Sequence, residues 1–249
     1  MISQNRVKQI QSLKTKKGRK KENLFVVEGL RCVESYIKKG SLLKELFVTN
    51  TFFKMNESLI KLCEKFNVTC SIITDENMKK LSDTKSPSGV FGVCTFVPPS
   101  SLDLGSKRWL YLYKISDPGN LGSLLRSAAW FNIKNVALSK ESIDPFNPKV
   151  VRSATGAHTF LNIYNNIDYK IFLDHGYYTI GADQNGTQNF EKSDFSKKLI
   201  LILGNESMGI DTQIKKDLNK IISIEKSGYG ESLNVAIAGS ILMSSLAKK

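Results

Sequence analysis

The sequence of 249 residues has no apolar run long enough to cross a membrane. A transmembrane helix needs about 20 predominantly apolar residues, and no run of even about 18 occurs here. The N-terminal residues from Met1 to Arg6 are mostly polar, and the apolar h-region of a secretory signal does not follow them. We therefore expect a cytoplasmic protein with neither a membrane span nor a secretory signal.

Cysteine and histidine are scarce. The four cysteines all lie in the first hundred residues without a C-x-x-C pair, and the two histidines, His158 and His175, lie far from them in sequence. Disulfide scaffolds and zinc sites need closely spaced sets of these residues. We expect neither a disulfide framework nor a bound metal.

Several catalytic and nucleotide-binding motifs are also missing. The segment from Gly204 to Gly209 has the glycine spacing of a P-loop but lacks its lysine, and no G-x-G-x-x-G follows an early strand. Neither histidine lies in a G-x-S-x-G or Cys/His context. These absences weigh against a P-loop NTPase, a dinucleotide-binding enzyme and a triad hydrolase.

Positive charge is the most informative feature that is present. Lys and Arg number 36 against 23 Asp and Glu, which gives a net charge of +13. Residues 1–100 carry 18 basic and 9 acidic side chains, whereas residues 101–249 carry 18 and 14. Such an excess favours a polyanionic partner such as nucleic acid over an acidic protein surface. The basic side chains are densest in residues 1–22, at Lys14, Lys16, Lys17, Arg19, Lys20 and Lys21.

This basic N-terminal segment, residues 1–22, is expected to be solvated and mobile until an anion neutralises it. The competing interpretation is a solvated tail that only keeps the protein soluble. RNA contact is favoured because the rest of the chain shares the same sign of charge.

The remaining chain divides into two α/β segments. Short β-rich runs alternate with helical patterns from Leu24 to Val97, and Pro98-Pro99-Ser100-Ser101 then interrupts them. A similar alternation starts again at Trp109, and Leu199 to Leu203 is a continuous apolar strand. This pattern predicts a mostly parallel sheet covered by helices on both faces. The domain boundaries that we predict are 23–99 and 105–249.

Four predicted strands of the second half end in glycine or polar residues. If the sheet is parallel, these ends converge on one edge and predict a single pocket. The four segments are Asp117 to Asn120, Gly181 to Asp183, Gly204 to Gly209, and Ser227 to Asn234.

Three polar side chains in these segments have structural explanations as well as functional ones. Asn120 is a good N-cap for the helix that follows it. Arg126, on the face opposite Leu124, would by itself be a surface cation. Glu206 follows a buried strand and a glycine, where a carboxylate needs a partner unless it caps a helix beginning near Ile210.

The last segment, from Leu233 to Leu246, is apolar or small nearly throughout. Such a helix is expected to be buried, in part against another subunit. Ser232 and Asn234 at its start would then need hydrogen-bond partners, although N-capping by Ser232 is again a competing explanation.

Three motifs follow one another within residues 107–249: DPGNLGSLLRSA from Asp117, LGNESMGI from Leu203, and ESLNVA from Glu231. In sequence and in order they resemble the three motifs of the SpoU (TrmH-type) RNA ribose 2′-O-methyltransferases of the SPOUT superfamily. Residues 144–152 also look like the family's segment between its first two motifs. The front module resembles the small α/β RNA-binding domain that precedes many such catalytic domains.

The resemblance implies an α/β fold whose C-terminal SPOUT domain has a parallel sheet and a deep trefoil knot. It also implies S-adenosyl-L-methionine as cofactor, a homodimer and an RNA substrate. By position, the family's catalytic or substrate residues fall on Asn120, Arg126, Glu206, Ser232 and Asn234. Its cofactor contacts fall on Gly204, Ile224 and Leu233, and Gly181 and Ala182 are expected in the same pocket. Members usually have proline where this chain has Glu225.

The implied reaction is methyl transfer to a ribose 2′-hydroxyl of a structured RNA, with ribosomal RNA favoured. The family proposal that the motif-one arginine is a general base is awkward, because a guanidinium is effectively always charged. Our hypothesis is that Arg126 grips a phosphate and stabilises the developing alkoxide, with Asn120 and Glu206 orienting it. Transfer RNA ribose methylation, base methylation by a SPOUT enzyme, and a non-catalytic RNA-binding or ribosome-assembly role remain as alternatives.

Overall fold

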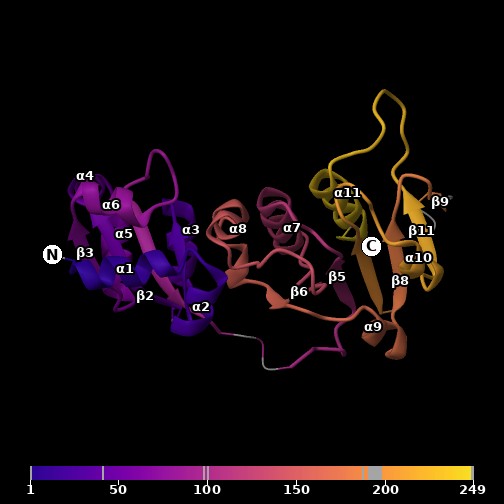
Figure 1. The fold of residues 1–249 in the computed structure, drawn as a ribbon, viewed down its shortest axis with the longest axis horizontal. Helices are drawn as coiled ribbons and strands as arrows, with labels where there is room; N and C mark the ends of the chain where they lie inside the picture. The colour runs from indigo at the N-terminus through magenta and orange to yellow at the C-terminus, as the bar shows by residue number, and fades with distance from the viewer. Residues whose placement is uncertain are drawn as a thin grey trace. The chain divides into compact units, whose positions relative to one another are not determined.

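A computed structural model describes residues 2–40, 42–97, 99, 101–186, 188–189 and 198–247. The chain forms two compact units, of which the first contains residues 1–97 and 146–159 and the second residues 98–145 and 160–249 (Figure 1). Pro98 and Ser100, in the proline-containing segment that we expected to end the first module, lie outside the described residues. No helix within the described ranges is long and apolar enough to cross a membrane.

The first unit is built on a mixed sheet that has, in the described ranges, the strand order β1-β4-β2-β3. β4 pairs antiparallel with both β1 and β2, and β2 pairs parallel with β3. The strands are β1 (Leu24–Glu28), β2 (Leu43–Thr49), β3 (Thr69–Ile73) and β4 (Val90–Thr95), and the helices that follow β1, β2 and β3 are α3 (Leu30–Lys38), α4 (Asn50–Met55), α5 (Glu57–Lys65) and α6 (Asp75–Leu81).

Alternate residues of each strand supply two apolar layers, one on each face of this sheet. Phe25 and Val27 of β1 pack with Val33 and Tyr36 of α3, whereas the intervening Val26 packs on the opposite face. The layer around Val26 includes residues that precede the sheet in sequence, Val7, Ile10 and Leu13. The N-terminal segment is therefore part of the folded core.

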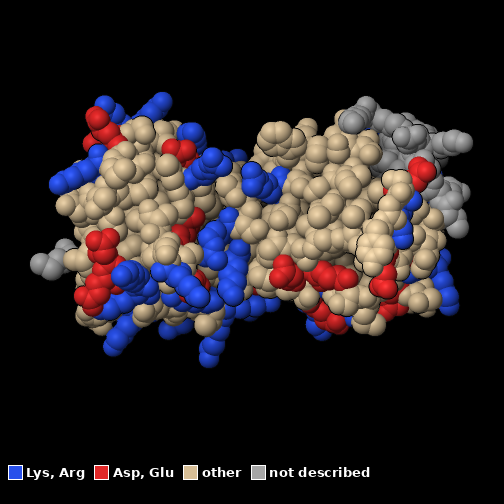
Figure 2. Space-filling view, turned by 90° about the horizontal axis from the view of Figure 1, so that it is seen from above, with Lys and Arg blue, Asp and Glu red and all other residues tan. Residues whose placement is uncertain are grey.

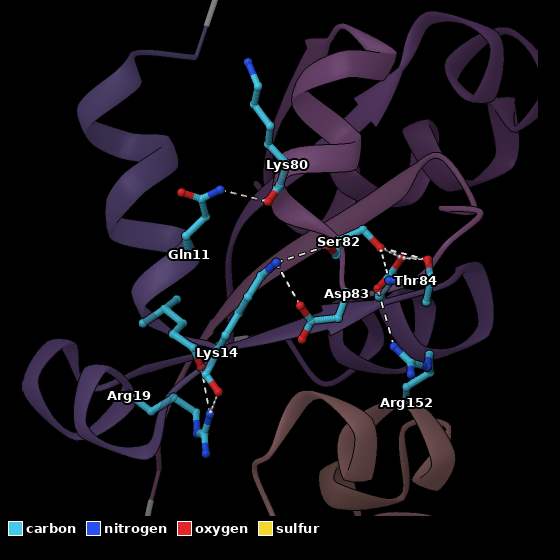
Figure 3. Close-up of polar contacts among 10 residues, drawn as sticks. Gln11, Lys14, Arg19, Lys80, Ser82, Asp83, Thr84 and Arg152 are labelled. Carbon is cyan, nitrogen blue, oxygen red and sulfur yellow. Dashed lines mark hydrogen bonds and ion pairs between the residues drawn. The ribbon is translucent and has the colours of Figure 1, made fainter.

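The prediction that the basic N-terminal segment is mobile is wrong. It forms α1 (Gln4–Ser12) and α2 (Lys16–Glu22), and Val7 and Ile10 are buried on the sheet. Arg19 is itself buried, and its guanidinium donates to the carbonyl oxygens of Leu13 and Lys14 at 2.8 and 3.0 Å (Figure 3). These bonds fix the start of α2 to the end of α1, because orphan carbonyls at a helix C-terminus need donors.

The segment Phe146–Thr159 also belongs to the first unit, although it falls within the predicted domain 105–249. It contains α8 (Pro148–Ala154) and the short helix η1 (Ala157–Thr159). The ring of Phe146 packs on Phe25 and Phe96, with centroids 5.0 and 4.5 Å apart. The packing of this partly buried aromatic side chain accounts for the grouping, since sequence position alone would place it with the later strands.

The second unit contains a parallel sheet, as predicted. Its order over the described strands is β7-β6-β5-β10-β8-β11-β9, and all its pairings are parallel. Its strands are β5 (Arg108–Leu112), β6 (Asn135–Leu138), β7 (Asn162–Tyr164), β8 (Tyr178–Ala182), β9 (Gln188–Asn189), β10 (Leu199–Leu203) and β11 (Lys220–Ser223).

Helices cover both faces of this sheet. Ile200 and Ile202 of β10 face α9 (Lys170–Asp174) and α10 (Thr212–Lys216), where they pack with Phe172 and Ile214. On the opposite face lie α7 (Pro118–Trp130) and α11 (Val235–Ala247). At Gly239 of α11, an added Cβ would meet Leu124 and Leu203 within 2.6 Å, so glycine lets α11 approach α7 and β10 closely.

Candidate active site

The four strand ends singled out from the sequence meet at one edge of the sheet. β5, β10, β8 and β11 are consecutive neighbours with parallel pairing, so their carboxyl ends lie side by side. The yellow loop between β11 and α11 projects from this edge (Figure 1). The predicted convergence is confirmed, and it occurs where open parallel sheets bind their ligands.

A cavity of about 710 Å³ opens at this edge. It is bounded by the residues that follow β8, β10 and β11, and by the start of α11. Of the residues predicted for the cofactor and the reaction, the lining includes Ala182, Gly204, Glu206, Ile224, Ser232 and Leu233. Glu225, which replaces the usual proline, is exposed on the same lining.

Gly181 is the predicted cofactor residue that the structure places elsewhere. A Cβ at this position would lie 2.4 Å from Leu218 and 3.0 Å from Ile210, so Gly181 faces the apolar layer below the site. Ala182, its neighbour in β8, lines the cavity because successive strand residues point to opposite faces.

Gly204 is held in a very close backbone contact. A Cβ there would lie 2.2 Å from the carbonyl carbon of Gly209 and 2.4 Å from the nitrogen of Ile210. Asn205 and Gly209 also exchange two backbone hydrogen bonds, of 3.0 and 2.9 Å. The loop after β10 is therefore a tight closed turn that forms one wall of the cavity.

A partly buried ion pair that the sequence did not reveal lies in the same cavity. Nζ of Lys215 is 2.5 Å from Oδ2 of Asp183. Burial acts to raise the pKa of Asp183, but hydrogen bonds from Lys215 and from the backbone of Asn185 outweigh it and lower that pKa. Asp183 could have been found from its place directly after β8, whereas no sequence signal marks Lys215.

Glu206 is half-buried and receives several hydrogen bonds from the loop that begins α7. The backbone N–H groups of Ser116 and Asp117 donate to its carboxylate at 3.4 and 3.2 Å, and Nδ2 of Asn120 donates at 3.2 Å. Burial acts to raise the pKa of Glu206, but the hydrogen bond from its own backbone N–H, together with those from Asn120, Asp117 and Ser116, outweighs it and lowers the pKa below its ordinary value. Glu206 is not a helix cap, because α10 begins at Thr212 with Asp211 as its N-cap.

Asn205 joins the same network, although it was not among the site residues predicted from the sequence. Its Nδ2 donates to the carbonyl of Lys114 at 2.8 Å and to Glu206 at 3.3 Å. Its Oδ1 accepts from the backbone nitrogens of Ser207 and Met208. Asn205 therefore connects the end of β5 to the loop that carries Glu206.

Asn120 links Glu206 to the start of the last helix. Its Oδ1 accepts from Nδ2 of Asn234 at 2.9 Å, while its own Nδ2 donates to Glu206. The expected N-cap role of Asn120 is wrong, because Asp117 is the N-cap of α7 and accepts from the backbone nitrogen of Asn120. Oδ1 of Asn234 accepts from the nitrogens of Ala236 and Ile237, so Asn234 rather than Ser232 caps α11.

Arg126 lies apart from this network. It is exposed on α7, and within the described residues it has no hydrogen bond or ion pair. The expectation that Asn120 and Glu206 orient Arg126 is therefore not met in this structure, since Asn120 uses its side chain on Glu206 and Asn234. Nor do the described ranges contain a group of three His, Cys, Asp or Glu side chains that could hold a metal ion.

Comparison with known families identifies both parts of the chain. Residues 107–244 match the model of the SpoU rRNA methylase family, and residues 4–92 match that of the MRM3-like substrate binding domain. The first match covers the parallel sheet and its convergent strand ends, so this part of the chain is an α/β methyltransferase domain. The chain belongs to the SpoU rRNA methylase family, and it is an RNA methyltransferase.

Individual relatives agree with this membership. The chain is 31% identical to the 23S rRNA (guanosine(2553)-2′-O)-methyltransferase RlmP of Bacillus subtilis over 245 residues, 96% of this chain and 94% of the relative. A structure described as an RNA methyltransferase of the TrmH family from Porphyromonas gingivalis is 28% identical, with a TM-score of 0.82 and coverage of 99% and 98%. The SpoU methyltransferase AviRb from Streptomyces viridochromogenes, solved with the cofactor AdoMet, has the same fold, with a TM-score of 0.85 at 22% identity and coverage of 99% and 98%.

Proposed function

We propose that this protein transfers a methyl group from S-adenosylmethionine to a ribose 2′-hydroxyl of ribosomal RNA. The observation that carries the proposal is the hydrogen-bonded chain from Asn234 through Asn120 to Glu206 beside the cavity. It unites the three motifs in one place. The similarity to RlmP, whose name specifies 2′-O-methylation of 23S rRNA, supports the reaction and the class of RNA.

The cavity suits S-adenosylmethionine in size and chemistry. Its volume of about 710 Å³ is in the range of small-molecule pockets. The close approach of Gly204 to Gly209 leaves backbone groups on the wall, which fits cofactor contacts through the backbone. Asp183 offers carboxylate oxygens, and we assign Ala182, Gly204, Ile224 and Leu233 to the cofactor site. When bound, the cofactor supplies an electrophilic methyl group.

The polar network positions the substrate ribose. Transfer to an oxygen requires the reacting atoms to approach to about 3 to 3.5 Å, and small misplacements are costly. Glu206 stays ionised because its pKa is lowered, and it holds the loop of Ser116 and Asp117 and the amide of Asn120. Ser232, on the cavity lining, and Asn234 complete the polar edge that faces the RNA.

Arg126 is assigned to the phosphate next to the target ribose and to the alkoxide that develops during transfer. Its exposure leaves the guanidinium available to an RNA phosphate. A general-base role is unfavourable because a guanidinium is effectively always protonated.

A homodimer is part of this proposal. Trp130 of α7 is 82% exposed, and Ile237 and Ile241 of α11 are 53% and 42% exposed. α7 and α11 pack together through Ser127 and Ser240, whose hydroxyls lie 2.7 Å apart, so these exposed side chains belong to one helix layer. A second copy is the occupant that the family resemblance implies. We also propose a trefoil knot in the second unit, supported by the placement of β10 between β5 and β8, and a cytoplasmic location.

The test is to incubate the purified protein and labelled S-adenosylmethionine with total RNA from a strain that lacks the gene. Nuclease P1 digestion and mass spectrometry of the nucleosides then distinguish ribose from base methylation. A labelled ribose in ribosomal RNA is the expected result. Label found in a base would show base methylation instead. Label found in transfer RNA alone would show that the substrate is transfer RNA. No cofactor binding by calorimetry would replace it with a non-catalytic RNA-binding role.

A further inference from the structure

The basic residues of α2 form an ordered, one-sided surface. Successive helical residues are about 100° apart, so Lys16, Lys17, Lys20 and Lys21 occupy an arc of about 140°. All four are exposed, whereas Gly18 and Arg19 on the other side of α2 are buried. We call this set, Lys16, Lys17, Lys20 and Lys21, the lysine face.

The helix that carries the lysine face is held rigidly. A Cβ at Gly18 would lie 2.0 Å from the carbonyl oxygen of Ser12, so α2 sits directly against the end of α1. Arg19 clamps the same junction through Leu13 and Lys14, and Lys14 in turn pairs with Asp83 at 2.8 Å (Figure 3). Gln9 of α1 also donates to Glu22 at the end of α2.

The charge of the lysine face is largely unpaired. Among the described residues, Lys21 is the one member of the lysine face with a carboxylate nearby. Its ammonium group is 3.9 Å from Glu22, and its side chain is still 80% exposed. Lys and Arg side chains also crowd the first unit in the view of Figure 2. Four ammonium groups on one side of a short helix repel one another, and an anionic partner relieves that repulsion.

The structure assigns the lysine face as a preformed contact surface for the phosphate backbone of the substrate RNA. This inference rests on the proposed function, which it deepens by naming where the RNA backbone lies on the first unit. The face offers ammonium groups and no apolar or aromatic side chain, which fits sequence-independent phosphate contact rather than base reading. Because α2 is already ordered, binding does not incur the ordering cost that a disordered tail would have.

The lack of apolar side chains also distinguishes RNA from a lipid surface. Helices that lie on membranes carry Trp, Phe or Leu opposite their basic side. In α2 the opposite side is Gly18, Arg19 and Glu22, and it is occupied by α1.

The experiment compares two variants with the same change in charge. One replaces Lys16, Lys17, Lys20 and Lys21 with Gln, and the control replaces the exposed Lys54, Lys61, Lys65 and Lys79 of the same unit. Binding to unmodified 23S rRNA transcript is measured across a salt series, with circular dichroism and S-adenosylmethionine calorimetry as checks on folding. Each lysine that contacts a phosphate contributes roughly 0.7 to 0.9 to the salt slope, so the lysine-face variant should lose about 3.

We expect the lysine-face variant to bind this RNA at least about tenfold more weakly near 0.1 M salt, while the control variant changes much less. Equal slopes for the two variants would overturn the inference. If the lysine-face variant lost binding to phosphatidylserine vesicles but kept its binding to RNA, the surface would be assigned to a membrane instead. Wild-type protein that binds RNA through α2 but methylates none would refute the proposed function and leave this inference intact.

A second variant tests the order of α2 without changing charge. Gly18→Ala forces α2 away from Ser12, so trypsin should cleave faster within residues 16–21 and RNA affinity should fall several-fold. Unchanged RNA affinity despite faster cleavage would show that the lysine face does not act as a preformed surface.

Discussion

Nδ2 of Asn234 donates to Oδ1 of Asn120 at 2.9 Å, joining residues that are 114 positions apart in the chain. Each amide has its other end occupied: Asn120 donates to Glu206, and Asn234 accepts from the first turn of α11. An amide has a distinct donor end and acceptor end, so this chain of bonds has one direction. Replacement of any member therefore changes more than one contact.

We predict that the two roles of Asn234 can be separated by substitution. Asn234→Ser keeps an oxygen that caps α11 but loses the donor to Asn120, so Tm should change little while kcat falls by about 10- to 100-fold. Asn234→Ala loses both, and the lost cap should cost a further 0.5 to 2 kcal/mol, roughly, of stability. Thermal unfolding and single-turnover methylation of 23S rRNA measure the two effects. A Ser variant with wild-type kcat would show that the bond to Asn120 is structural only.

A second carboxylate at position 205 is predicted to raise the pKa of Glu206. Asn205→Asp keeps the acceptor oxygen for the backbone N–H groups of Ser207 and Met208. It replaces the Nδ2 donor, which lies 3.3 Å from the Glu206 carboxylate, with the oxygen of a second carboxylate. A neighbouring like charge raises a carboxyl pKa. The acid limb of the kcat profile should therefore move to higher pH in this variant. Asn205→Ala adds no charge and serves as the control, for which we expect lower stability without that movement.

The lowered pKa of Glu206 also predicts how stability depends on pH. A carboxyl group whose pKa is lower in the folded state contributes stability above its unfolded pKa, here about 4.5, and that contribution is lost as the pH falls through the folded pKa. The Tm difference between wild type and Glu206→Gln should be constant near neutral pH and shrink below about pH 4.5. A difference that persists unchanged in acid would mean that the network does not require the carboxylate.

The sequence placed the main features of this site but misplaced some details, for physical reasons. Strand polarity and strand ends could be read from apolar runs followed by glycine, and this located the cavity edge. Asp117 and Asn120 are both good caps, and the structure uses Asp117 because Pro118 suits the first helical position. Gly181 and Ala182 were both assigned to the pocket, but successive residues of a strand point to opposite faces, and in β8 it is Ala182 that lines the cavity.

The sequence alone did not reveal that the N-terminal segment is folded. Its dense positive charge predicts a solvated tail, and its few apolar residues are too weak a signal to predict a buried helix. Val7, Ile10 and Leu13 recur at intervals of three, which is a helical stripe, but nine residues cannot form a stable helix alone. Their burial depends on the sheet and on α6, which come later in the sequence. Lys215 was missed for a similar reason, since its partner Asp183 is brought close only by the pairing of β8 and β11.

Glycines around the cavity are predicted to differ sharply in their tolerance of alanine. Gly204→Ala would bring a methyl group within 2.4 Å of backbone atoms of Gly209 and Ile210, which cannot move without opening the loop. We expect S-adenosylmethionine affinity to fall by more than about tenfold, because the wall of the pocket is displaced. Gly228→Ala, on the same lining with nothing within 4 Å, is the matched control and should bind normally by calorimetry. Equal affinities for the two variants would remove this loop from the cofactor site.

Arg126 can be tested as a base against its proposed role as a phosphate and alkoxide contact. Arg126→Lys keeps a positive charge but loses the planar two-pronged donor, and an ordinary lysine has a pKa of about 10.4, well below that of a guanidinium. If the side chain removed the ribose proton, the substitution would move the alkaline limb of the pH–rate profile. If it binds phosphate and stabilises the alkoxide, the rate should fall while the limb stays in place. The exposure of Arg126 and its separation from the bonds of Asn120 and Glu206 favour the second outcome, because they leave the guanidinium accessible to an RNA phosphate. Measurement of kcat for both proteins from about pH 6 to about pH 11, a window that includes the titration of the introduced lysine near 10.4, separates the two roles.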